Sequence, residues 1–376
     1  MPLIRISQIE EKWLYKELKE VKDVRDGTHS SPKYIDNGYP LVTSKNLTDS
    51  GLNLNDVSLI SESDYNEINK RSKVEVGDIL LGLIGTIGKP VLVDSEGFAI
   101  KNVGLIKNGG QLQNQFLLQY LKTNIFNKYI QIEMAGNTQK FLGLETLRNT
   151  KVPVPSPEEQ TAIGSLFRTL DDLLASYKDN LANYQFLKAT MLSKMFPKAG
   201  QTVPEIRLDG FEGEWERKNL SEVCNINSGR DYKHLKDGDI PVYGTGGYML
   251  SVNDKLSDED AIGIGRKGTI DKPYLLSAPF WTVDTLFYVT CKVGYDLYYL
   301  FLIFQKVRWK KFDESTGVPS LSKKTIEKVV SKFPSLPEQQ AIGAYFSNLD
   351  NLIATHQEKI TQLETLKKKL LQDMFV

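Results

Sequence analysis

The sequence has few of the residues that build disulfide or metal sites. Its 376 residues include two cysteines, Cys224 and Cys291, and three histidines, His29, His234 and His356. The cysteines lie 67 positions apart and the histidines are scattered. Neither a disulfide framework nor a zinc-ligand spacing is present, so the sequence predicts no metal site.

Long apolar runs are also missing. The longest strongly apolar run covers residues 297–304, which is eight residues. A helix needs about 20 apolar residues to cross a bilayer. The first eleven residues are polar and charged, unlike a secretory signal. We therefore expect a cytoplasmic protein with no membrane partner.

An excess of charge of either sign is absent as well. The chain has 47 basic and 47 acidic residues, and residues 1–154 alone carry 19 against 18. Residues 199–333 carry 19 against 19. Because phosphate neutralisation needs a local basic excess, a nucleic-acid complex of this chain should draw much of its electrostatic attraction from a partner.

The sequence contains no complete catalytic motif. Gly263-x-Gly265-x-x-Gly268 matches a dinucleotide fingerprint as a string, but Pro273 and a β-branched pair follow where a helix should open. The glycine-rich stretch 82–89 is one residue too long for a phosphate-binding loop, and Pro90 stands where Ser or Thr is needed. Neither a Gly-x-Ser-x-Gly elbow nor the Asn-Pro-Pro-aromatic motif of adenine methyltransferases occurs. The sequence predicts a chain without its own catalytic site.

The chain does contain an internal repeat at an offset of 179 residues. Residues 155–164 and 334–343 share their first proline, the Glu-Gln pair and Ala-Ile-Gly. Without a gap, three further pairs of neighbours match along the same offset: Leu170-Asp171 with Leu349-Asp350, Leu187-Lys188 with Leu366-Lys367, and Met195-Phe196 with Met374-Phe375.

Each copy of the repeat predicts one long helix. A proline-rich entry precedes an acidic first turn, and no proline interrupts residues 158–196 or 338–376. Apolar or aromatic residues then recur in alternating steps of four and three, which is a heptad seam. A seam needs a partner, and we expect the other copy, giving an antiparallel coiled coil with pseudo-two-fold symmetry. The alternative is that each helix packs only on its own domain.

The remaining halves are related more distantly. Trp13, Leu18 and Val21 match Trp215, Leu220 and Val223, and Gly85-Thr86-Ile87 matches Gly268-Thr269-Ile270. The pair Tyr120-Leu121 is matched with Tyr299-Leu300. Strand-like runs at 78–81, 90–93, 261–264 and 286–289 precede helices at 114–133 and 296–311. We predict an α+β fold with globular domains at 1–154 and 199–333 and helices at 155–198 and 334–376.

These motifs resemble the specificity subunit of type I restriction-modification systems over essentially the whole chain. They are Pro-x-x-x-Glu159-Gln160-x-x-Ile163, its second copy beginning at Pro334, and the entry Gly27-Thr28-His29-Ser-Ser-Pro32-Lys33-Tyr34. The second domain departs from this entry, with Ser228-Gly229-Arg230 and the residues up to His234 as its counterpart.

The resemblance implies two target-recognition domains that each read one half of a bipartite asymmetric site in double-stranded DNA. The helices would set the spacer between half-sites and dock two modification subunits, which bind S-adenosylmethionine and methylate adenine N6. Restriction subunits, using ATP with Mg²⁺, would complete a host-defence complex. This chain would hold no cofactor.

Polar side chains on loops are the candidates for DNA contact, because Arg, Lys, Asn and Gln read base edges and Ser and Thr bind phosphates. The DNA-binding candidates are Thr28, His29, Lys33, Ser44, Lys45, Asn46, Thr86, Lys89, Asn137, Gln139 and Lys140 in the first domain, and Arg230, Lys233, His234, Tyr243, Thr245, Arg266, Lys267, Thr316 and Ser320 in the second.

The long helices supply a second set of candidates, for the partner or helix interface. They are Glu159, Gln160, Ile163, Phe167, Leu170, Asp171, Leu174 and Tyr177 in the first copy, and Glu338, Gln339, Ile342, Phe346, Leu349, Asp350, Ile353, His356 and Ile360 in the second.

Three alternatives stay open. A coiled-coil scaffold without DNA binding would leave no footprint on DNA even with partner subunits present. A dehydrogenase or nucleotide hydrolase would gain thermal stability from NAD or ATP. A specificity subunit of a methylation-only system would lack an accompanying restriction gene.

Overall fold

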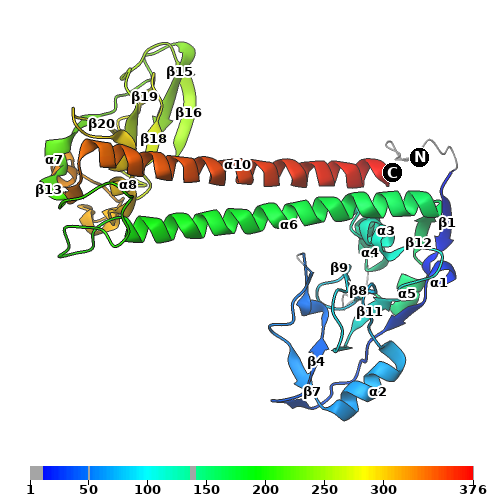
Figure 1. The fold of residues 1–376 in the computed structure, drawn as a ribbon. Coiled ribbons are helices and arrows are strands. Elements are labelled where there is room, and N and C mark those ends of the chain that lie inside the picture. The colour runs from blue at the N-terminus through cyan, green and yellow to red at the C-terminus, as the bar shows by residue number, and fades with distance from the viewer. Residues whose placement is uncertain (1–11, 50, 136–140, 376) are drawn as a thin grey trace. The chain divides into compact units, whose positions relative to one another are not determined.

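The computed structural model of the chain describes residues 12–49, 51–135 and 141–375. The chain divides into two compact units, the first made of two segments distant in sequence and the second of one continuous segment. Unit 1 comprises residues 1–178 and 358–376, and unit 2 comprises residues 179–357. The strand and helix content confirms the predicted α+β class (Figure 1).

Unit 1 contains two four-stranded sheets with short helices around them. One sheet has the order β2-β11-β8-β9, all antiparallel, and the other has the order β10-β4-β7-β3, in which only β10 and β4 run parallel. The strands are β1 (Leu14–Glu17), β2 (Val24–Asp26), β3 (Tyr34–Ile35), β4 (Tyr39–Val42), β5 (Leu47–Thr48), β6 (Gly51–Leu52), β7 (Ser58–Ile60), β8 (Ile79–Gly82), β9 (Pro90–Leu92), β10 (Ala99–Ile100), β11 (Val103–Ile106) and β12 (Lys151–Val154).

The helices of unit 1 include two in the region 114–133, where one or two were predicted. The chain breaks between them because the Thr123 side chain accepts a hydrogen bond from the Phe126 amide and caps a new helix. Lys122 lies at the joint between them. The helices are α1 (Leu18–Val21), η1 (Ser44–Asn46), α2 (Glu62–Ser72), α3 (Asn114–Leu121), α4 (Asn124–Glu133) and α5 (Leu144–Arg148).

Unit 2 has an antiparallel sheet of order β14-β20-β17-β18 and a smaller sheet of order β16-β15-β19. The smaller sheet contains one parallel pair, β15 with β19, just as the β10-β4-β7-β3 sheet of unit 1 contains one. The elements are β13 (Glu216–Asn219), α7 (Leu220–Val223), β14 (Cys224–Ser228), β15 (Asp237–Gly244), β16 (Gly247–Val252), β17 (Ala261–Gly265), β18 (Tyr274–Leu276), β19 (Trp281–Thr282), β20 (Leu286–Cys291), α8 (Leu297–Lys306), η2 (Trp309–Phe312), α9 (Lys323–Glu327) and β21 (Val330–Phe333).

The two repeats form the predicted long helices, α6 (Pro157–Lys194) and α10 (Leu336–Met374). Each begins in one unit and ends in the other. Within unit 1, Asp171 of α6 forms an ion pair with Lys367 of α10, and Lys178 lies 2.7 Å from Glu364. The numbers fall on α10 as they rise on α6, so the two segments contact in antiparallel directions.

Unit 2 repeats this contact with the matching residues. Lys188 of α6 lies 2.6 Å from Asp350 of α10, and the Tyr184 ring meets the His356 ring edge-on at 5.1 Å. Asp171 and Asp350 are repeat partners, as are Lys188 and Lys367. The Asp and Lys residues that match between the two copies of the repeat therefore form the same ion pair twice.

The end of each long helix completes a hydrophobic core. In unit 1, Phe375 packs against Trp13 and Phe116 at ring distances of 5.8 and 5.4 Å. In unit 2, Phe196 packs against Trp215 and Tyr299 at 5.9 and 5.4 Å. The matched Met-Phe pairs are thus core residues.

These contacts correct one sequence match. Tyr299 occupies in unit 2 the position that Phe116 occupies in unit 1. The predicted match of Tyr299 with Tyr120 was therefore wrong by one helical turn. The hydrogen bonds agree, because the amides of Gln113 and Asp296, the N-caps of α3 and α8, donate to the side chains of the repeat glutamines. Both helices are apolar on nearly every face, which leaves several registers equally plausible in sequence.

Candidate nucleic-acid interface

The Gly27-Thr28-His29 string forms a tight corner at the end of β2. The Gly27 amide donates to the Val103 carbonyl at 2.9 Å, and the Thr28 amide donates to the Ile100 carbonyl at 3.0 Å. A Cβ on Gly27 would overlap the Ile100 carbonyl oxygen, so the corner requires glycine. It places Thr28 and His29 together at one edge of the domain.

His29 is held by two neighbours at this corner. Its Nε2 lies 2.8 Å from Asp26 Oδ2 and its Nδ1 lies 2.9 Å from Asn102 Oδ1. Asp26 is buried and also pairs with Arg71. The ring is more than half exposed, so His29 is oriented by the fold while its face stays open.

The second domain builds the same corner from different residues. The Gly229 amide donates to the Leu286 carbonyl at 3.1 Å and the Arg230 amide to the Thr282 carbonyl at 2.8 Å. A Cβ on Gly229 would overlap the Val283 carbonyl oxygen. The counterpart that the sequence indicated at Ser228-Gly229-Arg230 therefore occupies the equivalent position.

A second loop follows the central strand of each domain. In unit 1, a Cβ on Gly82 would overlap the Thr86 carbonyl oxygen, and in unit 2 a Cβ on Gly265 would overlap that of Thr269. The loops therefore turn alike, and Thr86 is exposed at the first. In unit 2, Lys267 forms a β-bridge with Ser320, which brings the polar stretch 315–320 beside the loop.

Unit 2 contains a cleft, here called the unit 2 cleft, of about 600 Å³. Lys233 and Thr245 line it, and the amides of Arg266 and Lys267 both donate to the carbonyl of the lining residue Thr285. The cleft is lined by Asp231, Tyr232, Lys233, Gly244, Thr245, Gly246, Gly247, Tyr248, Met249, Val283, Asp284 and Thr285. Of the predicted residues, Lys233 and Thr245 therefore line the cleft, while Arg230 directly precedes the lining residue Asp231.

The cleft also contains residues that sequence reasoning missed. Tyr248 is 62% exposed and meets the Tyr243 ring edge-on, and Asp231 and Asp284 add two carboxylates. The Gly-Thr-Gly-Gly turn between β15 and β16 was the available signal for Tyr248. Carboxylates accept from cytosine amino groups, so a mixed cleft of this kind has groups for both donors and acceptors on bases.

Other predicted residues of unit 2 lie close by. The His234 ring lies edge-on to Trp281 at 6.0 Å, and Arg266 lies over the Phe287 ring at 5.9 Å. Thr316 is exposed in its loop. Asp313 organises that loop by accepting from the amides of Ser320 and Ser315, and these hydrogen bonds lower the pKa of Asp313.

Two predicted DNA contacts of unit 1 are contradicted by their burial. Asn46 is 3% exposed, and its amide is used by the backbone of Thr43, Asn53 and Asp56. Ser44 is 4% exposed and donates to the Asn102 carbonyl. Both side chains are thus used in the turn after β4.

The other candidates of unit 1 remain at the surface. Lys45 lies 3.6 Å from Asp56 in an exposed pair, and Lys89 lies 2.8 Å from Asp49. Lys33 is exposed. Asn137, Gln139 and Lys140 lie outside the described residues.

The glutamates and glutamines predicted for the partner or helix interface make contacts within the fold. Glu159 accepts from the Trp13 indole N–H at 2.9 Å, and Arg207 donates to both oxygens of Glu338 at 2.8 and 2.7 Å. The side chains of the two glutamates and of Gln160 and Gln339 are at most 2% exposed. The same packing buries most of the seam: Ile163, Phe167, Leu170, Leu174, Ile342, Phe346, Leu349 and Ile360 are buried, while Tyr177, Ile353 and His356 are half-buried.

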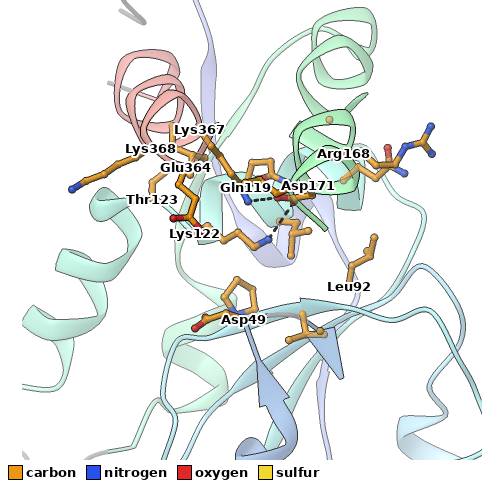
Figure 2. Close-up of a pocket in the computed structure, with 18 of the residues that line it drawn as sticks. Asp49, Leu92, Gln119, Lys122, Thr123, Arg168, Asp171, Glu364, Lys367 and Lys368 are labelled. Atoms are coloured by element: carbon orange, nitrogen blue, oxygen red, sulfur yellow. Dashed lines mark hydrogen bonds and ion pairs between the residues drawn. The ribbon is translucent and has the colours of Figure 1, made fainter. Parts of the chain in front are cut away.

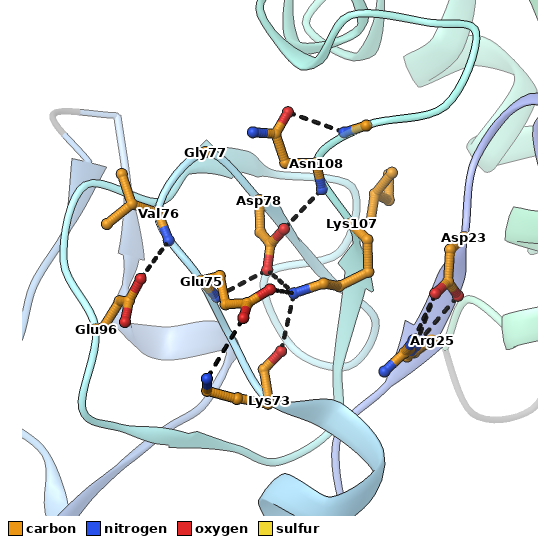
Figure 3. Close-up of polar contacts among 12 residues, drawn as sticks. Asp23, Arg25, Lys73, Glu75, Val76, Gly77, Asp78, Glu96, Lys107 and Asn108 are labelled. Carbon is orange, nitrogen blue, oxygen red and sulfur yellow. Dashed lines mark hydrogen bonds and ion pairs between the residues drawn. The ribbon is translucent and has the colours of Figure 1, made fainter.

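The most deeply buried carboxylate of the described residues is likewise structural. Asp78 is fully buried and accepts from Lys107 Nζ at 2.6 Å, the Asn108 amide at 2.7 Å and the Glu75 amide at 2.8 Å (Figure 3). Burial acts to lower the pKa of Lys107, but the carboxylates of Asp78 and Glu75 outweigh it and the pKa is raised. This cluster fixes the start of β8 against the end of β11.

No group of three or more His, Cys, Asp or Glu side chains within the described ranges is arranged to hold a metal ion. The helices described there also include none long and apolar enough to cross a membrane.

The two α+β domains thus repeat one corner at equivalent glycines, Gly27 and Gly229. Residues 10–183 and 212–365 match the family model for the type I restriction modification DNA specificity domain. The chain therefore belongs to this family, as the sequence motifs predicted.

Individual relatives support the assignment along the whole chain. It is 23% identical to the putative type I restriction enzyme MjaX specificity subunit of Methanocaldococcus jannaschii, covering 97% of this chain and 93% of that protein. It is 21% identical to the MjaVIII specificity subunit of the same organism, over 81% of this chain and 79% of that one. The S subunit structure from M. genitalium shares the fold, with a TM-score of 0.71 and 17% identity over 100% of this chain and 99% of that one.

Proposed function

We propose that this chain is the sequence-reading subunit of a type I restriction-modification complex, in which each globular domain binds one half of a bipartite asymmetric site in duplex DNA. One observation carries the proposal: the two domains share a backbone frame but carry different side chains on it. After the equivalent glycines come Thr28-His29 in one domain and Arg230-Asp231 in the other. A shared frame with different donors and acceptors is what two unlike half-sites require.

The long helices would act as the spacer between the two readers, as an antiparallel coiled coil with pseudo-two-fold symmetry. The duplicated Asp–Lys pair supports this, because it joins the helices in the same way within each unit. The helices also carry a duplicated apolar spot. Leu173 is 42% exposed and Leu352, its partner at the 179-residue offset, is 40% exposed. We assign these leucines to the docking of two identical modification subunits.

The chemistry would lie on the partners. Modification subunits would supply S-adenosylmethionine and methylate adenine N6, restriction subunits would use ATP with Mg²⁺, and the present chain would contribute position alone. The complex would work in the cytoplasm. A methylation-only complex would use this chain in the same way.

Co-expression with the modification subunit encoded by the neighbouring gene tests the proposal. Methylated adenines are mapped across the host genome, with the modification subunit alone as the control. We expect a motif of two different short blocks at a fixed separation, seen only with this chain present. An intact, purified complex that methylates no defined motif would show that the proposal is wrong.

A further inference from the structure

Unit 1 contains a cleft, here called the unit 1 cleft, of about 1180 Å³. Its walls come from α3, the joint after it, β9, and the segments of α6 and α10 that belong to unit 1 (Figure 2). Six basic residues and three acidic residues line it, although the whole chain is neutral. The basic residues are Lys122, Lys128, Arg168, Lys178, Lys367 and Lys368, and the acidic ones are Asp49, Asp171 and Glu364.

The three acids are already engaged by lysines. Lys122 and Lys367 both reach Asp171, as Figure 2 shows, and Lys178 pairs with Glu364. Asp49 pairs with Lys89, which lies outside the cleft lining.

Three of the lining cations are left over. Lys128, Arg168 and Lys368 are exposed, and they form neither an ion pair nor a side-chain hydrogen bond within the part of the chain that the structure describes. The excess positive charge of the cleft is therefore not neutralised by the protein.

The buried end of the cleft also favours an anion. Burial, followed by repulsion from Lys367, lowers the pKa of Lys122 despite the nearby carboxylates of Asp171 and Asp49. A bound anion would oppose both effects. The first residues of α4, from its cap Thr123 to Ile125, line the same space and add the positive end of a helix dipole.

The second copy of the repeat shows that folding does not need this charge. At the 179-residue offset, Arg168 corresponds to Ser347 and Lys178 to Gln357, while Lys368 corresponds to Ala189. The Asp–Lys pair between the helices is nevertheless kept in both units. Packing of the helices accounts for the conserved pair, and the additional cations of unit 1 need another explanation.

The cleft adjoins the candidate DNA-contacting loop of its own domain. Lys89 ends that loop and pairs with Asp49, which lines the cleft, and the next residue, Pro90, lines it too. A duplex held by the loop would present its phosphates to the cationic cleft.

We propose that the unit 1 cleft binds the sugar-phosphate backbone of duplex DNA beside the first half-site, without reading its sequence. This rests on the proposed function, because it takes the adjoining loop to be a DNA contact. Lys128, Arg168 and Lys368 are the phosphate ligands. Each neutralised phosphate releases condensed counterions, so the contact has a defined salt signature.

The test compares the complete complex with modification subunits, wild type against the triple variant Lys128→Gln, Arg168→Gln and Lys368→Gln. Binding to DNA that carries the motif found by the methylation map is measured across salt concentrations. The slope of log K against log salt should become shallower by about 2 to 3, at roughly 0.9 per phosphate contact, with the motif unchanged. The matched control, Lys12→Gln, Lys151→Gln and Lys369→Gln, removes three exposed lysines that do not line the cleft and should keep the wild-type slope.

Neutral methylphosphonate linkages then test whether DNA phosphates are the ligand. Placed stepwise on either side of the first half-site, they should weaken wild-type binding at some positions. At those positions the triple variant should show no further loss. Wild-type binding that is insensitive to every placement would overturn the proposal.

The remaining outcomes separate this inference from the proposed function. An unchanged salt slope in a triple variant that still methylates the same motif overturns the cleft assignment alone. A wild-type complex without any motif overturns the proposed function first. If the triple variant melts like the wild type but loses its modification subunits, the cleft is a protein contact and the phosphate assignment is wrong.

Discussion

At the scale of single residues, the chain keeps the glycines that shape its corners and varies the residues after them. Gly27 and Gly229 make equivalent backbone hydrogen bonds and have no room for a side chain. The next residue is Thr28 in one domain and Arg230 in the other, yet its backbone amide makes the same kind of hydrogen bond in both. Specificity can therefore change without changing the frame.

Arg266 is the second-domain side chain best placed to test such readout. It is exposed and lies over the Phe287 ring, and its amide is tied to Thr285 of the unit 2 cleft. Arg266→Ala should relax the base preference in one half-site only, since a bidentate contact to guanine contributes about 1–3 kcal/mol of discrimination. The methylation map reads this directly.

Arg217→Ala, which removes an exposed arginine of β13, is the control and should leave both half-sites intact. An equal loss in both half-sites of the Arg266 variant would count against a local reading role.

The two cysteines give a prediction about pH. They face each other across β14 and β20 as free thiols, and burial raises the pKa of each from 9.0 to about 12. Between these values the unfolded thiols lose their protons while the folded ones keep them. The free energy of unfolding should therefore fall as pH rises from 9 towards 12.

Urea denaturation at a series of pH values measures this dependence. A Cys224→Ala, Cys291→Ala double variant should show a smaller loss of stability over the same window. Identical pH profiles for the two proteins would rule out the buried thiols as the cause.

At the scale of elements, the long helices were predictable and their surroundings were not. The helices predicted at 155–198 and 334–376 agree with α6 and α10 to within four residues at each end. Glu159 and Glu338 looked like surface charges suited to a partner, yet Trp13 and Arg207 come from distant segments to bury them. Periodicity shows which face of a helix is apolar, but not which remote side chain will cover its polar residues.

The aromatic residue at the end of each helix should be essential to the unit it reaches. Phe375 and Phe196 are 2% and 4% exposed in equivalent aromatic clusters. Phe375→Ala and Phe196→Ala should each cost about 3–5 kcal/mol of unfolding free energy. Phe186→Ala, at a 75% exposed position, should cost no more than about 0.5 kcal/mol in the same denaturation assay.

Leu173 and Leu352 should determine how many modification subunits the chain binds. Leu173→Glu and Leu352→Glu each place a charge in one proposed docking surface, so each single variant should retain one modification subunit and the double variant none. Native mass spectrometry of the purified complex counts the subunits. Leu14→Glu, at a 65% exposed position on β1, is the control, and full occupancy in the double variant would dismiss these leucines as docking residues.

At the scale of the molecule, neutrality hid the electrostatics. The net charge of zero indicated that neither domain has a basic excess. It could not reveal that Lys122, Arg168 and Lys368 line one cleft. These residues are up to 246 positions apart, and only the fold brings them together. The convergence of Lys233, Thr245 and the Arg266 loop was hidden for the same reason.

The central claim is that two independent readers are joined by symmetric helices, and a duplicated-reader chain tests it most directly. Residues 199–333 replace residues 1–154, so the second domain stands before both helices. The graft suits the scaffold because Met195-Phe196 and Met374-Phe375 complete both domain cores with the same residue types. Methylated adenines are then mapped with the modification subunit present. The account predicts an inverted repeat of one half-site, and retention of the original asymmetric motif would contradict it.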